Sequence, residues 1–318
     1  MKTIGITGAS GMIGNRLISH LQRTFPEVHL KCLVRSLPQN SSSCGTEWFQ
    51  GDLMSEPDCA EFVADVDVLI HLAQANSPAI SDRHWPSDLQ CNLTSSLNLL
   101  QALRNRGGEP CHLIFSSSGG AIYGFNPLDG PDFDEDQPCK PVSPYGIQKL
   151  TVENYIRLAV LQGWLTATIL RISNAFGDML PLEKRQGFVG VAASRLRAGL
   201  PLKIFGPLET IRDYVHLDDI CSAVEKASIR KNGFEVFNIG SGQGASVREI
   251  LDILREVTQD EVRVETSTFG SQVFNLMPKV VLSVRKAELE MGWKPQIGLR
   301  EGIERLWRTA RLTTNHTK

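Results

Sequence analysis

The chain has 318 residues and a nearly balanced charge, with 33 Lys and Arg against 35 Asp and Glu and a formal net charge of -2. Its length suits one large α/β unit with an added lobe, or about two domains, and is enough to bury a core without disulfides or metals. The balanced charge, with no block of basic residues, argues against a protein that binds nucleic acid.

The location of the protein follows from three further features. No stretch approaches the roughly 18 consecutive apolar residues of a membrane-spanning helix, and a strand pattern that starts at Thr3 leaves no room for a signal peptide. The seven cysteines are scattered and include no C-x-x-C pair, which argues against a disulfide scaffold and a zinc site. We therefore expect a cytoplasmic protein that neither enters a membrane nor binds a metal.

The predicted elements alternate between short apolar strands and amphipathic helices up to Ile172. In chain order they are a strand at Thr3–Thr7, a helix at Gly14–Arg23, strands at Leu30–Val34 and Val66–Ala73, a helix at Leu89–Leu103, a strand at His112–Ser116, a helix at Pro144–Leu161 and a strand at Ala167–Ile172. Such alternation is typical of βαβ units, so we predict an α/β fold with a doubly wound parallel sheet.

The pattern becomes irregular after Ile172, where we predict helices at Val215–Ser228 and Val247–Thr258 and, before it, a long surface segment at Phe125–Pro144. We place a nucleotide-binding domain at residues 1–175 and a smaller mixed α/β substrate lobe at residues 176–312, with segments near 213–245 returning to the first domain. The polar tail Thr313–Lys318 is predicted to be disordered.

A glycine-rich turn, Thr7-Gly8-Ala9-Ser10-Gly11-Met12-Ile13-Gly14, connects the first strand to the first helix. Glycine allows the backbone to turn with positive φ and to approach a pyrophosphate, which the N-terminus of the following helix attracts. The spacing is G-x-x-G-x-x-G rather than the usual G-x-G-x-x-G. The turn therefore predicts a dinucleotide site, and an ordinary β-to-α turn is the alternative.

Arg35 follows the second strand at the position where an acidic residue would select NAD. An arginine there accommodates the 2′-phosphate of NADP, although stacking on adenine or facing solvent are equally good explanations. Asp52, followed by Leu53, comes after a presumed third strand. Its carboxylate is a candidate acceptor for the adenine amino group, and the alternative is an aspartate that caps a turn.

Ser116-Ser117-Ser118 ends a strand at the edge where open α/β sheets bind ligands, and Tyr145 and Lys149 follow in the first turns of a helix. At i and i+4 these two side chains share one helix face. A nearby ammonium, a helix N-terminus and an oxidised nicotinamide all favour the tyrosine phenolate, which would then act as a base. An ordinary amphipathic helix is the alternative explanation of the Tyr-x-x-x-Lys spacing.

These segments together resemble the extended short-chain dehydrogenase/reductase family, and more narrowly its nucleotide-sugar 4-epimerases. The matching segments are Thr7–Gly14, His71–Ala73, Asn92–Leu93, Phe115–Gly124, Ser143–Lys149, Leu170–Gly177, Arg212–Asp219, Phe237–Gly240 and Gly292–Pro295. The resemblance implies a Rossmann-type fold, a bound NAD or, because of Arg35, NADP, and a homodimer formed through two helices of each subunit. The helices at Leu89–Leu103 and Pro144–Leu161 are the candidates, and their apolar faces are equally consistent with a core within one chain.

The resemblance also implies the roles of individual residues. The catalytic set is Ser118, Tyr145 and Lys149, and Ser117 is the alternative serine because an extra glycine before Ala121 makes the alignment uncertain by one residue. Asn174 and Arg212 match positions that hold the substrate diphosphate, and a surface ion pair of Arg212 with Asp213 is the competing explanation. The cofactor set is Gly8, Ser10, Gly11, Met12, Ile13, Gly14, Arg35, Asp52, Leu53, Leu72, Ala73, Asn92, Tyr145 and Lys149; the substrate set is Ser117, Ser118, Asn174 and Arg212.

The residues after the serine narrow the predicted chemistry. Similar dehydratases and decarboxylases carry acidic residues there, and 3,5-epimerising members carry a cysteine, whereas this chain has Gly119, Gly120 and Ala121. Hydride transfer at one carbinol carbon remains, which means 4-epimerisation of a UDP-hexose or a derivative or, as the alternative, NADPH-dependent reduction of a 4-keto sugar. Gln272 and Asn275 stand where similar epimerases have an arginine and an acid, which weakens the UDP assignment.

A third hypothesis is a protein without enzymatic activity that senses a dinucleotide or serves as a scaffold on the same fold. Such proteins often lose the tyrosine or the lysine, and this chain has both. We therefore rank this hypothesis below the two enzymes.

Overall fold

The computed structural model describes residues 2–38, 45–74, 85–184, 186–230, 233–267 and 277–314. The chain divides into two compact units, each assembled from several segments: unit 1 is Met1–Ser118, Pro144–Arg171 and Cys221–Phe237, and unit 2 is Gly119–Ser143, Ile172–Ile220 and Asn238–Lys318. This division concerns compactness only. The functional division near residue 175 stays a prediction.

Unit 1 is built on a seven-stranded sheet with the strand order β10-β6-β5-β4-β1-β2-β3. The strands are β1 Thr3–Thr7, β2 His29–Val34, β3 Thr46–Gln50, β4 Val68–His71, β5 Cys111–Ser118, β6 Leu165–Ile172 and β10 Phe234–Ile239. The β1–β2, β1–β4, β2–β3 and β4–β5 pairs are parallel. The strand order reverses between β1 and β4, which confirms the predicted doubly wound, Rossmann-type sheet.

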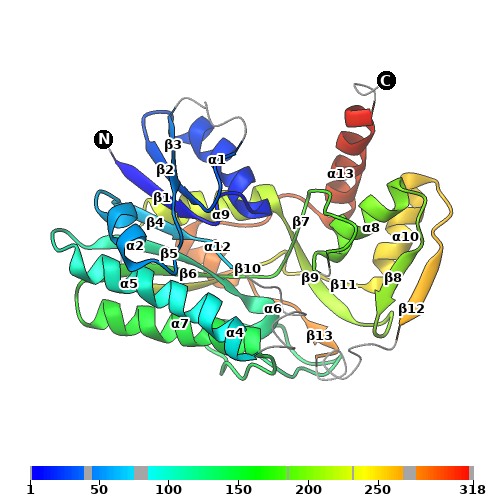
Figure 1. The fold of residues 1–318 in the computed structure, drawn as a ribbon. Helices are drawn as coiled ribbons and strands as arrows, with labels where there is room; N and C mark the ends of the chain where they lie inside the picture. Colours follow the sequence, from blue (N-terminus) through cyan, green and yellow to red (C-terminus); the bar gives the residue numbers. More distant parts are fainter. Residues whose placement is uncertain are drawn as a thin grey trace. The chain divides into compact units, whose positions relative to one another are not determined.

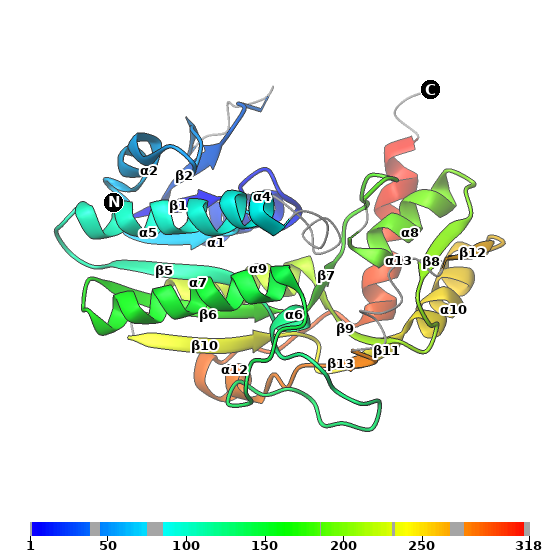
Figure 2. The same ribbon diagram turned by 60° about the horizontal axis from the view of Figure 1, so that its bottom comes forward.

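Helices cover both faces of this sheet (Figures 1 and 2). They are α1 Met12–Thr24, α2 Glu56–Val63, α4 Trp85–Leu89, the π-helical turn η1 Gln90–Thr94, α5 Ser95–Asn105, α7 Pro144–Leu161 and α9 Leu217–Ser228. Helices α2, α5 and α7 share one hydrophobic core, which includes Phe62, Leu103 and Ile156. Helices α1 and α9 lie next to each other and are joined by a 2.6 Å contact between His20 Nε2 and Glu225 Oε2.

Three predicted elements differ from the observed ones in ways that bear on the site. Strand β4 ends at His71, so Leu72 and Ala73 leave the sheet at its carboxyl edge. The helix predicted to begin at Leu89 begins at Trp85, and its start is separated from α5 by the π-helical turn. The first two residues of the helix predicted at 215–228 belong to strand β9 instead. Helix α7 has the predicted bounds.

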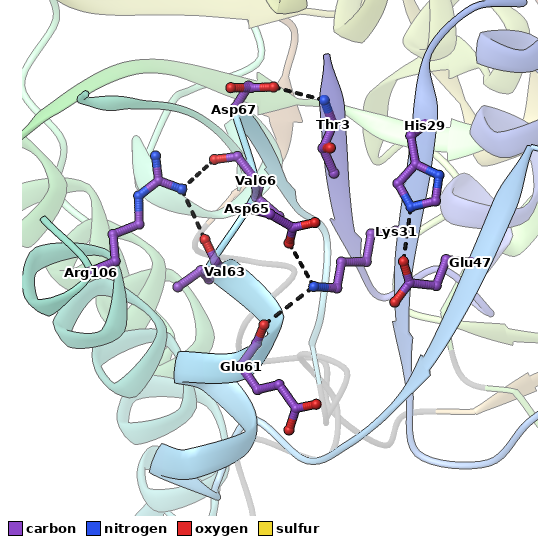
Figure 3. A network of polar contacts seen from close by, with 10 residues as sticks. All are labelled: Thr3, His29, Lys31, Glu47, Glu61, Val63, Asp65, Val66, Asp67 and Arg106. Atoms are coloured by element: carbon purple, nitrogen blue, oxygen red, sulfur yellow. Dashed lines mark hydrogen bonds and ion pairs between the residues drawn. The ribbon is translucent and has the colours of Figure 1, made fainter. Parts of the chain in front are cut away.

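A polar network stabilises unit 1 near the amino ends of its central strands (Figure 3). The buried Lys31 ammonium donates to Asp65 Oδ1 at 2.7 Å and to the Glu61 carbonyl oxygen at 3.3 Å. Arg106 donates to the carbonyl oxygens of Val63 and Val66. Cations at carbonyl groups that a helix leaves unpaired stabilise its C-terminus, here that of α2.

Unit 2 contains a four-stranded sheet of β7 Asn174–Phe176, β9 Ile211–His216, β11 Gly244–Ser246 and β13 Lys279–Val280, and a two-stranded sheet of β8 Leu202–Phe205 and β12 Val264–Ser267. Its helices are α6 Gly119–Ile122, α8 Phe188–Arg197, α10 Val247–Thr258, α12 Arg285–Met291 and α13 Leu299–Thr314. Helix α10, predicted with the same bounds, starts with a capping box of Ser246 and Glu249. On α13, a Cβ at Gly302 would overlap the Phe176 ring and approach His216, so this helix lies directly on β7 and β9.

The segment predicted to lie on the surface, Phe125–Pro144, is only partly exposed. Phe133 is buried, stacks on the Tyr123 ring at 4.7 Å between centroids and joins a small core with Val280 and Leu282. Among the residues that the structure describes, no helix is long and apolar enough to cross a membrane.

Candidate active site

The glycine turn after β1 is too tight for side chains at two of its glycines. Gly8 has a φ of +71°, and a Cβ there would lie 2.7 Å from the Ala73 backbone nitrogen. A Cβ at Gly14 would overlap the Gly8 carbonyl oxygen. Gly11 precedes α1, whose first turn has no side-chain cap and no acidic residue. A tight glycine turn followed by a helix N-terminus without a side-chain cap suits a pyrophosphate. The predicted cofactor contacts of Gly8, Ser10, Gly11, Met12, Ile13 and Gly14 stay a prediction.

Leu72 and Ala73 lie against this turn because β4 pairs with β1. Their backbone N–H groups donate to the Thr7 carbonyl oxygen at 3.2 Å and to Thr7 Oγ1 at 3.3 Å. Thr7 Oγ1 also lies 2.7 Å from His71 Nδ1. Burial, with a smaller contribution from the Lys149 charge, lowers the pKa of His71 to about 3, so this imidazole is neutral.

Asn92 lies on the π-helical turn and is buried. Its side-chain amide donates to Asp88 Oδ1 at 2.8 Å, and its carbonyl oxygen accepts from Ser96 Oγ at 2.9 Å. Asp88 also accepts from Gln148 Nε2 on α7 at 2.6 Å. Asp88, on α4, thus connects Gln148 of α7 with Asn92 of the π-helical turn. The predicted contact of Asn92 with the cofactor stays a prediction.

The other predicted cofactor residues lie at the ends of β2 and β3. Arg35 is exposed, and its carbonyl oxygen accepts a hydrogen bond from Gln50. Asp52 is exposed, and its Oδ1 accepts from the Met54 N–H at 2.9 Å, which is the turn-capping arrangement. Leu53 is buried. A contact of Asp52 with adenine stays a prediction, as does the role of Arg35.

The structure brings Ser118, Tyr145 and Lys149 together at the carboxyl end of β5. The hydroxyl groups of Ser118 and Tyr145 are hydrogen-bonded. The Lys149 ammonium donates to the Ser116 carbonyl oxygen at 2.8 Å and lies 5.8 Å from the centroid of the Tyr145 ring. The Ser117 hydroxyl instead donates to the Glu153 carboxylate. Of the two alternative serines, only Ser118 thus contacts the tyrosine.

The pKa of Tyr145 in the structure differs from the lowered value that the sequence predicted for the site with its cofactor. Burial raises the pKa of Tyr145 to about 12, against a smaller lowering by the Ser118 hydrogen bond. Burial lowers the pKa of Lys149 to about 8, which the Glu153 carboxylate partly opposes. The side chains alone therefore keep the phenol protonated. The lower tyrosine pKa that the sequence predicted depends on its third contribution, the positive charge of an oxidised nicotinamide.

Asn174 and Arg212 lie on the paired strands β7 and β9 of unit 2. Asn174 donates to the Asp213 carbonyl oxygen at 2.9 Å. In the described part of the chain, the Arg212 guanidinium makes one hydrogen bond, to the Ile211 carbonyl oxygen at 2.8 Å. Burial lowers the pKa of Arg212, which reflects the cost of a buried charge without an anion.

The alternative explanation of Arg212, an ion pair with Asp213, is wrong. The fully buried Asp213 carboxylate accepts from the N–H and hydroxyl groups of Ser241 at 2.7 Å and from the Leu282 N–H at 3.3 Å. Neighbouring residues in a strand point to opposite faces, which separates the two side chains. The predicted departures at Gln272 and Asn275 lie outside the described residues.

Sequence reasoning missed a buried ion pair, one member of which contacts the serine segment. Glu153 and Arg171 form an ion pair of 2.8 Å, and Glu153 also receives the Ser117 hydroxyl. The available signal was the helical spacing, because Glu153 lies four residues after Lys149 on the same face of α7.

A parallel sheet with a glycine turn after its first strand and a Ser-Tyr-Lys group after its fifth defines a Rossmann-type dinucleotide-binding protein. Residues 4–240 match the NAD dependent epimerase/dehydratase family, and the chain belongs to this family. The predicted resemblance to the extended short-chain dehydrogenases/reductases is thereby confirmed.

Individual relatives resemble the chain over nearly its whole length. A UDP-glucose 4-epimerase of Thermotoga maritima, solved with UDP-glucose, is 30% identical with a TM-score of 0.87, covering 98% of this chain and 99% of the other. The Thermus thermophilus UDP-glucose 4-epimerase, solved with NAD, is 27% identical with a TM-score of 0.86, covering 97% and 99%. A dTDP-4-dehydro-6-deoxyglucose reductase of Escherichia coli is 28% identical over 96% of each chain.

Proposed function

We propose that this chain is a nucleotide-sugar 4-epimerase that interconverts UDP-glucose and UDP-galactose, or derivatives of them, through transient oxidation at C4. The observation that carries the proposal is the Ser118–Tyr145–Lys149 group, followed by Gly119, Gly120 and Ala121, which offer no further acid or base. The epimerase relatives support the same reaction.

The side chains divide the work of this reaction. Tyr145 Oη takes the proton of the C4 hydroxyl and returns it, Ser118 holds the same hydroxyl, and the Lys149 ammonium stabilises the phenolate. Arg212 and Asn174 hold the diphosphate, so that the sugar presents either face of C4 while its nucleotide stays bound. NAD, the cofactor of the family, supplies reversible hydride acceptance when bound in the glycine turn with Leu72 and Ala73.

The test is to supply purified protein with UDP-glucose and no added cofactor and to follow UDP-galactose by NMR. Ligands released on denaturation are identified by mass spectrometry. We expect interconversion and co-purified NAD, since the cofactor is regenerated in every cycle. A protein that contained no NAD and formed no UDP-galactose would contradict the proposal.

The second candidate, a reductase of a nucleotide 4-keto sugar, is favoured by the reductase relative and by Arg35. Its signature is an empty protein that consumes NADPH in proportion to the keto sugar reduced. The same mass spectrum and a measurement of NADPH absorbance separate the two reactions.

We also propose a cytoplasmic homodimer. Helix α7 exposes apolar side chains at helical spacing, namely Ile147, Tyr155, Leu158 and Leu161, beside α5. The seven cysteines are scattered and include no C-x-x-C pair, which suits a reducing compartment. Light scattering should give twice the chain mass, and an Ile147→Asp/Leu158→Asp variant should give the chain mass.

A further inference from the structure

Glu153 is a buried carboxylate on α7 that the proposed reaction does not use. It is 4% exposed and accepts hydrogen bonds from Arg171 Nη2 at 2.8 Å and Arg171 Nε at 3.3 Å. Its third donor is the Ser117 hydroxyl on β5. A carboxylate with three donors from two neighbouring strands has a fixed position, because each bond restricts the same two oxygen atoms.

The contacts on either side of Ser117 give this fixed position a consequence. The Ser116 carbonyl oxygen accepts from the Lys149 ammonium at 2.8 Å, and the Ser118 hydroxyl is bonded to Tyr145. Glu153 therefore holds Ser117. The residues on either side of Ser117 contact the catalytic pair, Ser116 contacting Lys149 and Ser118 contacting Tyr145. Lys149 and Glu153 also lie one turn apart on the same helix face.

We propose that Glu153, fixed by Arg171 and Ser117, is a positioning residue for the reaction: its charge keeps Lys149 protonated, and its bond to Ser117 places Ser118 against Tyr145. This inference rests on the proposed function for the reaction it serves. The two parts of the inference, charge and tether, are separable by substitution.

The surroundings of Lys149 support the electrostatic part. Within the described ranges Lys149 has no carboxylate at ion-pair distance, and burial lowers the pKa of its ammonium to about 8, while the Glu153 charge opposes that fall. Titratable groups on the elements around it include Tyr145 and Glu153 on α7, His71 on β4, Arg171 on β6 and Asp88 on α4. His71 is neutral, and Arg171 is paired with Glu153. The Glu153 charge is the one that raises the pKa of Lys149.

If the Glu153–Arg171 pair had only a structural role, its loss would leave the pKa of Lys149 unchanged. A buried ion pair that only connects α7 to β6 would change the stability when broken and leave the lysine of the folded protein unaffected. The pKa of Lys149 in the folded state therefore separates the two explanations.

The experiment for the charge is NMR of the purified holoprotein labelled with [6-13C]lysine, titrated from pH 6 to 11. The Lys149 signal is assigned by its loss in Lys149→Arg. Glu153→Gln should lower the pKa of Lys149 by about one pH unit or more, and Glu153→Asp, which keeps the charge, should restore most of it. The alkaline limb of turnover should move to lower pH in Glu153→Gln by the same amount.

A control variant and a safeguard accompany this titration. Glu235→Gln removes a carboxylate from another ion pair of unit 1, with Arg230, and should leave Lys149 unchanged. If Glu153→Gln fails to fold because Arg171 is left unpaired, Glu153→Gln/Arg171→Met removes both charges and should still lower the pKa of Lys149. An unchanged pKa of Lys149 in the folded variant overturns this part of the inference.

The tether is tested by Ser117→Ala, which leaves the Glu153–Arg171 pair intact. We expect kcat to fall about 10-fold with an unchanged KM and an unchanged pKa of Lys149, because Ser118 loses its fixed neighbour. Full wild-type kcat in this variant would overturn the tether. If the wild-type protein turned over no nucleotide sugar, the proposed function would fail, whereas the lysine titration would still give its own answer.

Discussion

Lys31 and Lys149 are buried to the same degree, each 6% exposed, near opposite ends of the strands of one sheet. Lys31 has a carboxylate partner, Asp65, at 2.7 Å and lies in the network of Figure 3. Lys149 donates to a carbonyl oxygen, that of Ser116, and in the described part of the chain has no carboxylate at ion-pair distance.

The two lysines show that the hydrogen-bond partner, rather than the extent of burial, decides whether a buried lysine forms a stabilising ion pair or has a pKa suited to catalysis. The Lys31 hydrogen bond lowers the pKa of Asp65, so this pair stabilises the fold as an ion pair. Lys149 has its own pKa lowered to about 8, which brings its proton into the range where enzymes work. Arg171 and Arg212 repeat the contrast, since the first is paired with Glu153 and the second makes one bond to a backbone carbonyl.

Replacing Lys149 should have the largest effect. Lys149→Met should lower kcat about 10²- to 10⁴-fold, because Tyr145 loses the charge that favours its phenolate. The same variant should be more stable than wild type at pH 7, by up to about 3 kcal/mol, since the folded state no longer buries an ammonium. Turnover assays and urea unfolding measure the two effects. A variant that lost both activity and stability would show that Lys149, like Lys31, stabilises the fold.

The stability difference between Lys149→Met and the wild type should shrink as the pH rises. The pKa of Lys149 falls from an ordinary 10.5 to about 8 on folding, so the unfolded chain binds more protons between these values. Wild-type stability should therefore rise through this range relative to Lys149→Met, and the two unfolding free energies should converge above pH 10.5.

Arg212 extends the comparison to unit 2. Arg212→Met should raise the KM for a UDP-sugar about 10- to 100-fold with little change in kcat, because a charged donor to the diphosphate is lost. Arg171→Met should instead destabilise the fold, since it leaves Glu153 buried and unpaired. An unchanged KM for Arg212→Met would remove this residue from the substrate site.

His71 tests whether the Lys149 region tolerates a second positive charge. Its pKa is about 3 in the folded state and 6.5 ordinarily, so the unfolded chain gains a proton first as the pH falls. The free energy of unfolding should drop by about 2 kcal/mol between pH 6.5 and pH 5. His71→Gln should abolish most of this slope in urea titrations, and an equal slope in both proteins would show that other groups cause it.

Lys31 should give the smallest effect. Lys31→Met should change the unfolding free energy by about 1 kcal/mol or less, because Asp65 is more than half exposed and regains water when its partner is removed. Turnover should not change. A loss of activity in Lys31→Met would break the contrast between the two lysines.

The catalytic segments were predictable because their signals are local. The glycine turn lies at the end of an apolar strand, and Ser143-Pro144 marks the start of α7 at its observed first residue. Helix α2 was not predicted, since its eight residues make too short a period to recognise. The early start of α4 is tertiary in origin: buried Asp88 is bonded to Gln148, 60 residues away.

The sequence left other features of the site open because they depend on long-range contacts. The choice between Ser117 and Ser118 follows from Glu153, which lies on a different element and takes one of the two hydroxyl groups. The raised pKa of Tyr145 reflects how deeply α7 packs on β5, which the local spacing does not contain. The roles of these residues in catalysis stay predictions until the variants are measured.

Gly302 has a practical consequence for work with this protein. With no room for a side chain there, α13 lies on Phe176 and His216, the last residues of the strands that carry Asn174 and Arg212. A chain shortened into this helix would expose those strands from one side. We expect such a truncation to weaken UDP-sugar binding and to aggregate, so an affinity tag should extend the chain beyond this helix rather than replace its last turns.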